Sequence, residues 1–393
     1  MVVEEPMTIN ERRTSLKRML PRYRAANRAE RGRLLAEMET MTGLHRKSLI
    51  RLLAAPSLAR APRRATRTRV YGAEIAAIIA VVWESMDYVC AERLTPVLVE
   101  TAAHLATFDE LILTPPLLLQ LAAISRATVG RMLRGMRRPS PRLPRRGPEQ
   151  ANRLRKAVPM GRLPWQTTTP GWFEVDVVHH CGTSTAGDYL HTLQLVDIAT
   201  GWSERVAILG RGQQAMEAGF RHVIARLPFP ILHLHPDNGS EFFNDHLVRF
   251  WGTEITGLTL SRSRPYQKND NRFVEQKNDT LVRAYVGYDR LETVAQRDAL
   301  NLLYEQLWVY YNLFQPVLHL IDKERQAERV IRKWDDARTP YQRLVAAGGV
   351  DEATRARLDA IYAATNPRQL RRAMYAGLAR LWEHETTALI AAD

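Results

Sequence analysis

The sequence changes its hydrophobic period at Trp172, and this change limits the folds open to the chain more than any other feature. Before Trp172 the apolar residues recur at helical spacing. After it come three segments rich in β-branched and aromatic residues, at 172–181, 189–199 and 202–209. The short turns between these segments contain glycine and predict an antiparallel meander of three strands.

Further elements alternate after residue 209. We expect a helix, a strand, a helix, a short strand and a last helix, at 212–226, 231–235, 241–251, 258–262 and 269–286. Asn269 or Asp270 can cap the last helix. This order predicts an α/β fold in which helices flank a mixed sheet.

Three carboxylates fall at special places in this order. Asp176 lies within the first strand, Asp237 directly after the fourth, and Glu275 on the helix after the fifth. If the first and fourth strands are neighbours, the two aspartates converge at the sheet edge, and the helix brings Glu275 alongside. The turn Asn238-Gly239 lets the backbone leave sharply, which keeps Asp237 open. Converging carboxylates without a histidine trio favour Mg²⁺ or Mn²⁺. Two such ions about 4 Å apart would clamp both oxygens of a phosphodiester displacement.

The charge balance predicts a polyanionic partner. The 56 Lys and Arg residues exceed the 42 Asp and Glu residues, which gives a net charge of +14. The alternative is a merely solvated basic surface. Basic residues crowd between Arg131 and Pro164, where Glu149 is the only acid. This proline-rich stretch is either a soluble tether or a linker that follows phosphates. Its candidate DNA contacts are Arg137, Arg138, Arg145 and Arg146.

Two segments before the linker resemble each other at an offset of 80 residues. These are LHRKSLIRLL at 44–53 and ISRATVGRML at 124–133. Their apolar positions coincide, and their polar residues share the opposite face. Such a helix suits the recognition helix of a helix-turn-helix module, and an ordinary helical hairpin is the alternative. The candidate base-contacting residues are Arg46, Lys47, Arg51, Arg126, Thr128 and Arg131.

The remaining features concern organisation and location. The longest apolar run, IAAIIAVVW at 75–83, is too short to cross a membrane and is expected in a buried helix. Cys90 and Cys181 are the only cysteines, and no signal-type segment stands at the N-terminus. We therefore expect a cytoplasmic, nucleoid-associated protein. The segment GRGQQ at 210–214 lacks the Lys-Ser/Thr of a phosphate-binding loop, so no nucleotide cofactor is expected.

Five blocks carry a resemblance to a known family: VDVVHHCG, VDIATGWSE, HPDNGSEF, SRSRPYQKNDNRFVEQKN and YNLFQP. Together they resemble the catalytic core of bacterial insertion-sequence transposases with an Asp-Asp-Glu (DDE) site, a ribonuclease-H-like core shared with retroviral integrases. The resemblance covers about 166–318. It implies an integrase-type core at 166–318 and a C-terminal region at 319–393, which we expect to be mainly helical. The two helical units and the basic run described above predict helix-turn-helix DNA-binding domains at 1–58 and 70–138 and a basic linker at 139–165.

The resemblance implies that Asp176, Asp237 and Glu275 hold the metal. Their spacings of 61 and 38 positions suit the family pattern. The implied cofactor is Mg²⁺, as two ions, with Mn²⁺ as a substitute. The implied reaction is cleavage at transposon ends and attack by the freed 3′-hydroxyl on target DNA. The implied partners are double-stranded DNA and, on it, further copies of the chain; no membrane is implied. Pro236 and Arg272 depart from the family pattern without removing a ligand.

Other polar residues have structural explanations or weaker roles. Lys268, close to Glu275, is a candidate contact to the scissile strand. Asp197 is expected to cap a turn, and Glu174, on the face of Asp176, would need a partner if buried. The adjacent His179, His180 and Cys181 alternate faces on a strand and cannot reach one ion.

Two other functions fit the same sequence. One is a ribonuclease-H-like nuclease that cuts DNA without joining it. The other is a sequence-specific DNA-binding protein whose core is inactive. The retention of all three carboxylates argues against the second.

Overall fold

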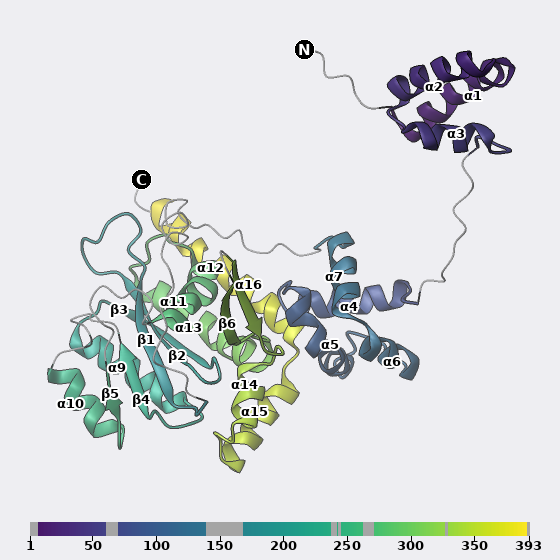
Figure 1. Cartoon of the computed structure of the whole chain (residues 1–393). Coiled ribbons are helices and arrows are strands. Elements are labelled where there is room, and N and C mark those ends of the chain that lie inside the picture. The colour runs from purple at the N-terminus through teal and green to yellow at the C-terminus, as the bar shows by residue number, and fades with distance from the viewer. Residues whose placement is uncertain are drawn as a thin grey trace. The chain divides into compact units, whose positions relative to one another are not determined.

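The computed structural model describes residues 7–59, 70–138, 168–236, 242, 245–261, 271–326 and 329–390 (Figure 1). The chain forms two compact units, Met1–Val70 and Tyr71–Asp393.

The first unit is a bundle of three helices, α1 (Ile9–Ala25), α2 (Arg28–Thr42) and α3 (Arg46–Ala54). Thr8 begins α1 with a reciprocal capping box. Gly43 ends α2 at a φ of 67°, the left-handed conformation that glycine adopts without strain. The fully buried Leu16, Met38 and Leu49 form the centre of the core, one from each helix.

The second unit begins with four helices, α4 (Ala73–Ser85), α5 (Ala91–Ala106), α6 (Pro115–Ala123) and α7 (Arg126–Gly135). The apolar run at 75–83 lies in α4 and is largely buried, as predicted. The starts of α3 and α7 repeat the offset of 80 residues, and Leu49 and Val129 are both fully buried. The structure thus confirms the predicted apolar stripe of each helix. No helix in the described ranges is long and apolar enough to cross a membrane.

A five-stranded sheet follows, in the order β3-β2-β1-β4-β5. Its strands are β1 (Trp172–His179), β2 (Leu190–Asp197), β3 (Ser203–Leu209), β4 (His233–Pro236) and β5 (Thr259–Leu260). The first three form the predicted antiparallel meander, whereas β4 runs parallel to both β1 and β5. The predicted neighbourhood of the first and fourth strands is confirmed.

Helices separate the later strands in the predicted order. They are α9 (Gln213–Arg226), α10 (Asp245–Glu254) and a last helix of three parts, α11 (Arg272–Lys277), the π-helical η1 (Asn278–Arg283) and α12 (Ala284–Val286). The predicted caps Asn269 and Asp270 lie outside the described residues, and the cap position of α11 is Asn271. The mixed α/β fold class is confirmed.

The rest of the chain is mainly helical, as predicted, apart from one hairpin. Its elements are α13 (Val294–Val309), the π-helical η2 (Tyr310–Phe314), β6 (Leu320–Gln326), β7 (Arg329–Trp334), α14 (Pro340–Ala346), α15 (Glu352–Ala364) and α16 (Pro367–Ile390). The antiparallel pair β6–β7 was not predicted. Its sequence is highly charged and shows no apolar alternation that would reveal it.

Ion pairs and hydrogen bonds join α4 and α5 to the C-terminal helices. Arg371 of α16 donates to Asp87 at 2.8 and 3.0 Å, and Tyr310 donates to the carbonyl of Ser85 at 2.7 Å. Arg93 of α5 donates to the carbonyl of Pro316 at 2.6 Å. These contacts explain why 71–138 belongs to the same compact unit as the sheet. The linker at 139–165 lies outside the described residues, and the five domain boundaries stay predictions.

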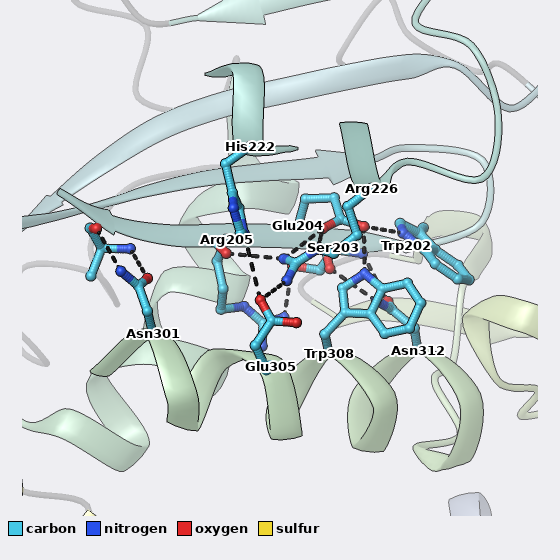
Figure 2. A network of polar contacts seen from close by, with 11 residues as sticks. Trp202, Ser203, Glu204, Arg205, His222, Arg226, Asn301, Glu305, Trp308 and Asn312 are labelled. Atoms are coloured by element: carbon cyan, nitrogen blue, oxygen red, sulfur yellow. Dashed lines mark hydrogen bonds and ion pairs between the residues drawn. The ribbon is translucent and has the colours of Figure 1, made fainter. Parts of the chain in front are cut away.

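A buried carboxylate ties the edge of the sheet to two helices (Figure 2). Glu204 of β3 accepts hydrogen bonds from Trp202 Nε1 at 2.8 Å and Trp308 Nε1 at 2.6 Å. It also pairs with Arg226 of α9 at 2.8 Å, and Arg226 reaches on to Glu305 of α13. Because Glu204 is fully buried, its charge depends on these donors.

Two asparagines complete the same edge. β3 is the last strand on its side of the sheet, so some of its backbone groups have no neighbouring strand. Asn301 accepts from the amide of Ala207 at 2.7 Å and donates to its carbonyl at 3.0 Å. Asn312 exchanges the same two bonds with Ser203, each at 3.0 Å. The asparagine side chains therefore take the place of a further strand (Figure 2).

Replacing the buried carboxylate should destabilise the fold. In Glu204→Gln the new amide nitrogen is itself a donor and lies against the indole donors of Trp202 and Trp308. The charge of Arg226 also loses its buried partner. Together these effects should lower the free energy of unfolding by about 3 kcal/mol. The matched change Glu305→Gln affects a side chain that is 50% exposed and should cost under about 1 kcal/mol. Urea unfolding followed by tryptophan fluorescence measures both, and equal losses would contradict the role of Glu204.

Candidate active site

The candidate site lies where β1 and β4 run side by side. Asp176 stands on β1 and is half-buried. In the parallel register, Val175 pairs with Pro236, the last residue of β4. The strand that precedes Asp237 in the sequence therefore ends next to the residue before Asp176. Asp237 itself lies outside the described residues.

Glu174 holds the start of helix α11 against β1. Its Oε2 accepts the backbone N–H groups of Phe273 at 2.7 Å and Val274 at 2.9 Å. These are orphan donors of the helix N-terminus, so the carboxylate acts as a cap supplied by a distant strand. Glu174 is fully buried, and burial raises its pKa to about 8 despite the two bonds. The partner that this buried acid needed is thus the backbone of α11.

Asp176 is bound to the same helix one turn further on. Asn278 Nδ2 donates to Asp176 Oδ2 at 2.6 Å, and the amide of Val177 donates to Oδ1 at 2.8 Å. Glu275 precedes Asn278 by three residues, so the two side chains lie on neighbouring positions of one helix face. Glu275 is exposed. Glu275 therefore lies within one helical turn of the residue that binds Asp176.

The chemistry of this edge suits a hard cation. Asp176 and Glu275 carry carboxylate oxygens of the kind that such a cation prefers, and the side-chain amide of Asn278 holds the carboxylate of Asp176. Within the described ranges no group of three His, Cys, Asp or Glu side chains is close enough to hold a metal ion. The predicted third ligand, Asp237, and the predicted strand contact, Lys268, both lie outside those ranges.

The candidate DNA-binding residues of α3 are open to solvent. Arg46, Lys47 and Arg51 are all exposed. Lys47 and Arg51 are each two positions from the buried Leu49 and so lie on the opposite side of the helix. The guanidinium of Arg46 donates to the carbonyl of Gly32 at 3.5 Å, and its backbone amide donates to Glu39 at 3.2 Å.

The candidates around α7 differ among themselves. Arg126 and Arg131 are exposed, whereas Thr128 is half-buried and accepts a bond from Arg131 Nη2 at 2.9 Å. Arg137 is exposed, and the guanidinium of Arg138 lies over the rings of Trp83 and Tyr88 at 5.6 and 5.5 Å. Arg138 is therefore held against the protein as well as facing solvent. The other two linker candidates, Arg145 and Arg146, lie outside the described residues.

The rival polar residues have structural partners. Asp197 accepts the amides of Gly171 and Thr200, each at 2.8 Å, and so closes the turn after β2, as predicted. His180 is fully buried and bonds to Thr192 at 2.8 Å, and burial lowers its pKa to about 3. His179 contacts Tyr189 instead. The two histidines thus have different neighbours, as expected for adjacent positions of a strand.

Sequence reasoning missed Asn278 and did not identify the partner that Glu174 would need. Asn278 is the last letter of the block NDNRFVEQKN, so the block itself was the available signal. Nothing local marks the partners of Glu174, because they are 99 and 100 residues away along the chain.

The strand order β3-β2-β1-β4-β5 and the helices between the later strands define a mixed α/β protein with a five-stranded sheet. The chain belongs to the same family as the uncharacterized protein y4rM of Sinorhizobium fredii (strain NBRC 101917 / NGR234). The two are 36% identical over 326 residues, which cover 83% of this chain and 92% of the relative. No protein-family model matches the sequence.

Parts of solved integrase structures are also similar. The simian T-cell lymphotropic virus intasome, in complex with PP2A regulatory subunit B56 gamma, matches 51% of this chain and 66% of its own at 15% identity and a TM-score of 0.33. The catalytic core domain of BIV integrase matches 45% and 95% at 18% identity and a TM-score of 0.30. The HTLV-2 integrase core with magnesium matches 38% and 91% at 17% identity and a TM-score of 0.28.

The cap formed by Glu174 can be tested without any activity. Glu174→Ala leaves the amides of Phe273 and Val274 without an acceptor, which should cost about 1–3 kcal/mol and speed their hydrogen exchange. Glu174→Gln keeps an acceptor oxygen and should retain most of the protection. Exchange at these two amides measures the effect, and unchanged protection in the alanine variant would show that the cap is not needed.

Proposed function

We propose that the chain is a DDE transposase, which cuts transposon ends and joins the freed 3′-hydroxyl to target DNA. One observation carries the proposal. The strand pairing of Val175 with Pro236 and the bond from Asn278 to Asp176 link the middle of β1 to the end of β4 and to one helix. Asp237 follows Pro236 directly in the sequence, which would add a third carboxylate there.

In this function Asp176, Asp237 and Glu275 would hold Mg²⁺, or Mn²⁺ in its place. When bound, two such ions neutralise the charge that develops on the attacking and leaving oxygens. The protein's part is to hold the ligands still. Glu174 fixes the start of the helix that carries Glu275, and Asn278 fixes one oxygen of Asp176.

The partner in this proposal is double-stranded DNA, at transposon ends and at the target. The net charge of +14 and the exposed cations of α3 and α7 support it. Two ends must be handled together, so we expect a dimer or larger assembly on DNA. A nuclease without joining activity would leave cleaved DNA that is never joined to the target. A DNA-binding protein with an inactive core would leave the DNA uncut.

Removing any one of the three carboxylates should stop the reaction. Asp176→Asn, Asp237→Asn and Glu275→Gln should each lower cleavage and joining by at least about a thousandfold, because each removes a ligand charge while the shape is kept. DNA binding should stay nearly unchanged. The measurement is cleavage and strand transfer on labelled transposon-end duplexes with Mg²⁺.

Glu241→Gln is the matched control, since this acid stands close to Asp237 in the sequence. It should retain most activity. If Glu275→Gln were as active as the unchanged chain, the third ligand would be wrongly assigned. Cleaved but never joined products would favour the nuclease.

The two similar helices should read sequence, whereas the linker should not. Lys47→Ala or Arg131→Ala should each reduce discrimination between end and scrambled duplexes by about 1–3 kcal/mol. Replacing Arg145 and Arg146 together should weaken binding to all DNA alike and flatten the salt dependence by about one unit of slope per lost phosphate contact. Titration of both duplexes over a salt series measures this. Unchanged discrimination in both helix variants would move recognition elsewhere in the chain.

A further inference from the structure

A large basic cavity lies beside the helix that carries Glu275. Its volume is about 870 Å³, within the range of small-molecule sites. Its walls come from α11, the turn between β2 and β3, the β6–β7 hairpin and α14. The cationic or titratable side chains that line it are Arg272, Lys277, Arg332, Arg338, Arg343 and His319. None of the described residues that line it is acidic.

The positive charge around this cavity is only partly balanced. Lys277 lines the cavity and is half-buried. Arg343 lines the cavity, is 7% exposed and pairs with Asp335 at 2.5 Å, yet its Nε has no hydrogen-bond partner among the described residues. Buried donors and charges of this kind are stabilised by an anion.

Aromatic and aliphatic side chains share the same walls. Trp334 of β7 lines the cavity and is 47% exposed. Phe273 and Leu318 line it as well. A basic groove with an open aromatic ring is the combination that binds unpaired bases, because the cations meet the phosphate and the ring stacks on the base. A phosphate alone would leave most of the volume and the tryptophan unused.

The cavity is next to the candidate active site. Arg272 lines it and precedes Glu275 by three residues on the same helix, so the two lie on neighbouring positions of one face. Gln276 and Lys277, which directly follow Glu275, line it too. A strand held at Glu275 could therefore continue into the cavity.

We propose that this cavity binds an unpaired nucleotide of a DNA strand held at the candidate active site. The phosphate would meet Lys277, Arg332 and Arg338, and the base would stack on Trp334. The proposal rests on the transposase function and adds to it a preference for DNA whose end is frayed or single-stranded.

Strand β7 offers matched controls. Side chains alternate along a strand, so Arg332 and Trp334 share the face that lines the cavity, whereas Ile331 and Lys333 belong to the other face. Ile331 is 47% exposed, the same fraction as Trp334. Ile331→Ala and Trp334→Ala therefore truncate equally exposed side chains, and only Trp334 lines the cavity.

The experiment compares two duplexes of one sequence, one blunt and one with a short unpaired 3′ end. The full chain is titrated with each in EDTA, so that no metal-dependent step contributes, and binding is followed by fluorescence anisotropy. We expect the unpaired end to bind about tenfold more tightly, the equivalent of one stacked base. Trp334→Ala and Arg332→Gln should abolish this preference, whereas Ile331→Ala and Lys333→Gln should keep it.

Three outcomes would overturn the proposal. The first is equal binding of both duplexes by the unchanged chain. The second is a loss of preference in the control variants as large as in Trp334→Ala. The third is displacement of the duplex with the unpaired end by free thymidine monophosphate at an equal concentration. That result would mean that the cavity binds a free nucleotide and not a DNA strand. Cleavage with Mg²⁺ is measured separately, so a chain that shows the preference but never cuts DNA would refute the transposase function and uphold the cavity.

Discussion

The bond between the Glu174 carboxylate and the first amides of α11 is the contact on which the rest of the candidate site depends. It joins the middle of the sheet to a helix that begins nearly a hundred residues later. Together with the bond from Asn278 to Asp176 one turn further on, it holds the start of that helix against β1. The cost of burying the polar side chain of Glu174 is offset by these two hydrogen bonds.

The order of strands and helices was predictable because each element carries its own periodicity. The three-strand meander, α9 and β4 match the expected ranges within about two residues. β5 is shorter than expected, and the β6–β7 hairpin was not found, because charged residues occupy both of its faces and local patterns then give no signal. Hydrophobic alternation reports burial, so it fails where a strand is exposed.

The site was predictable as a set of residue types and only partly as an arrangement. The positions of Asp176 and Glu275 follow from local motifs, and the pairing of β1 with β4 agrees with the expected convergence. The roles of Glu174 and Asn278 depend on contacts across about a hundred residues, which no local pattern encodes. The same holds for the packing of Asp87 against Arg371, which makes the second helical region part of the larger unit.

The π-helical segment η1 separates two faces of one continuous helix. Its wider turns contain more residues than α-helical turns would, so the face set by Glu275 and Asn278 is rotated relative to the face that Val286 packs into the core. The helix face of the candidate site and the face that packs into the core therefore do not follow a single α-helical repeat. An alignment with a chain that has a regular α-helix here would need a gap inside 278–283. Without that gap, Glu275 would be matched correctly, but the residues of α12 that pack into the core would be shifted.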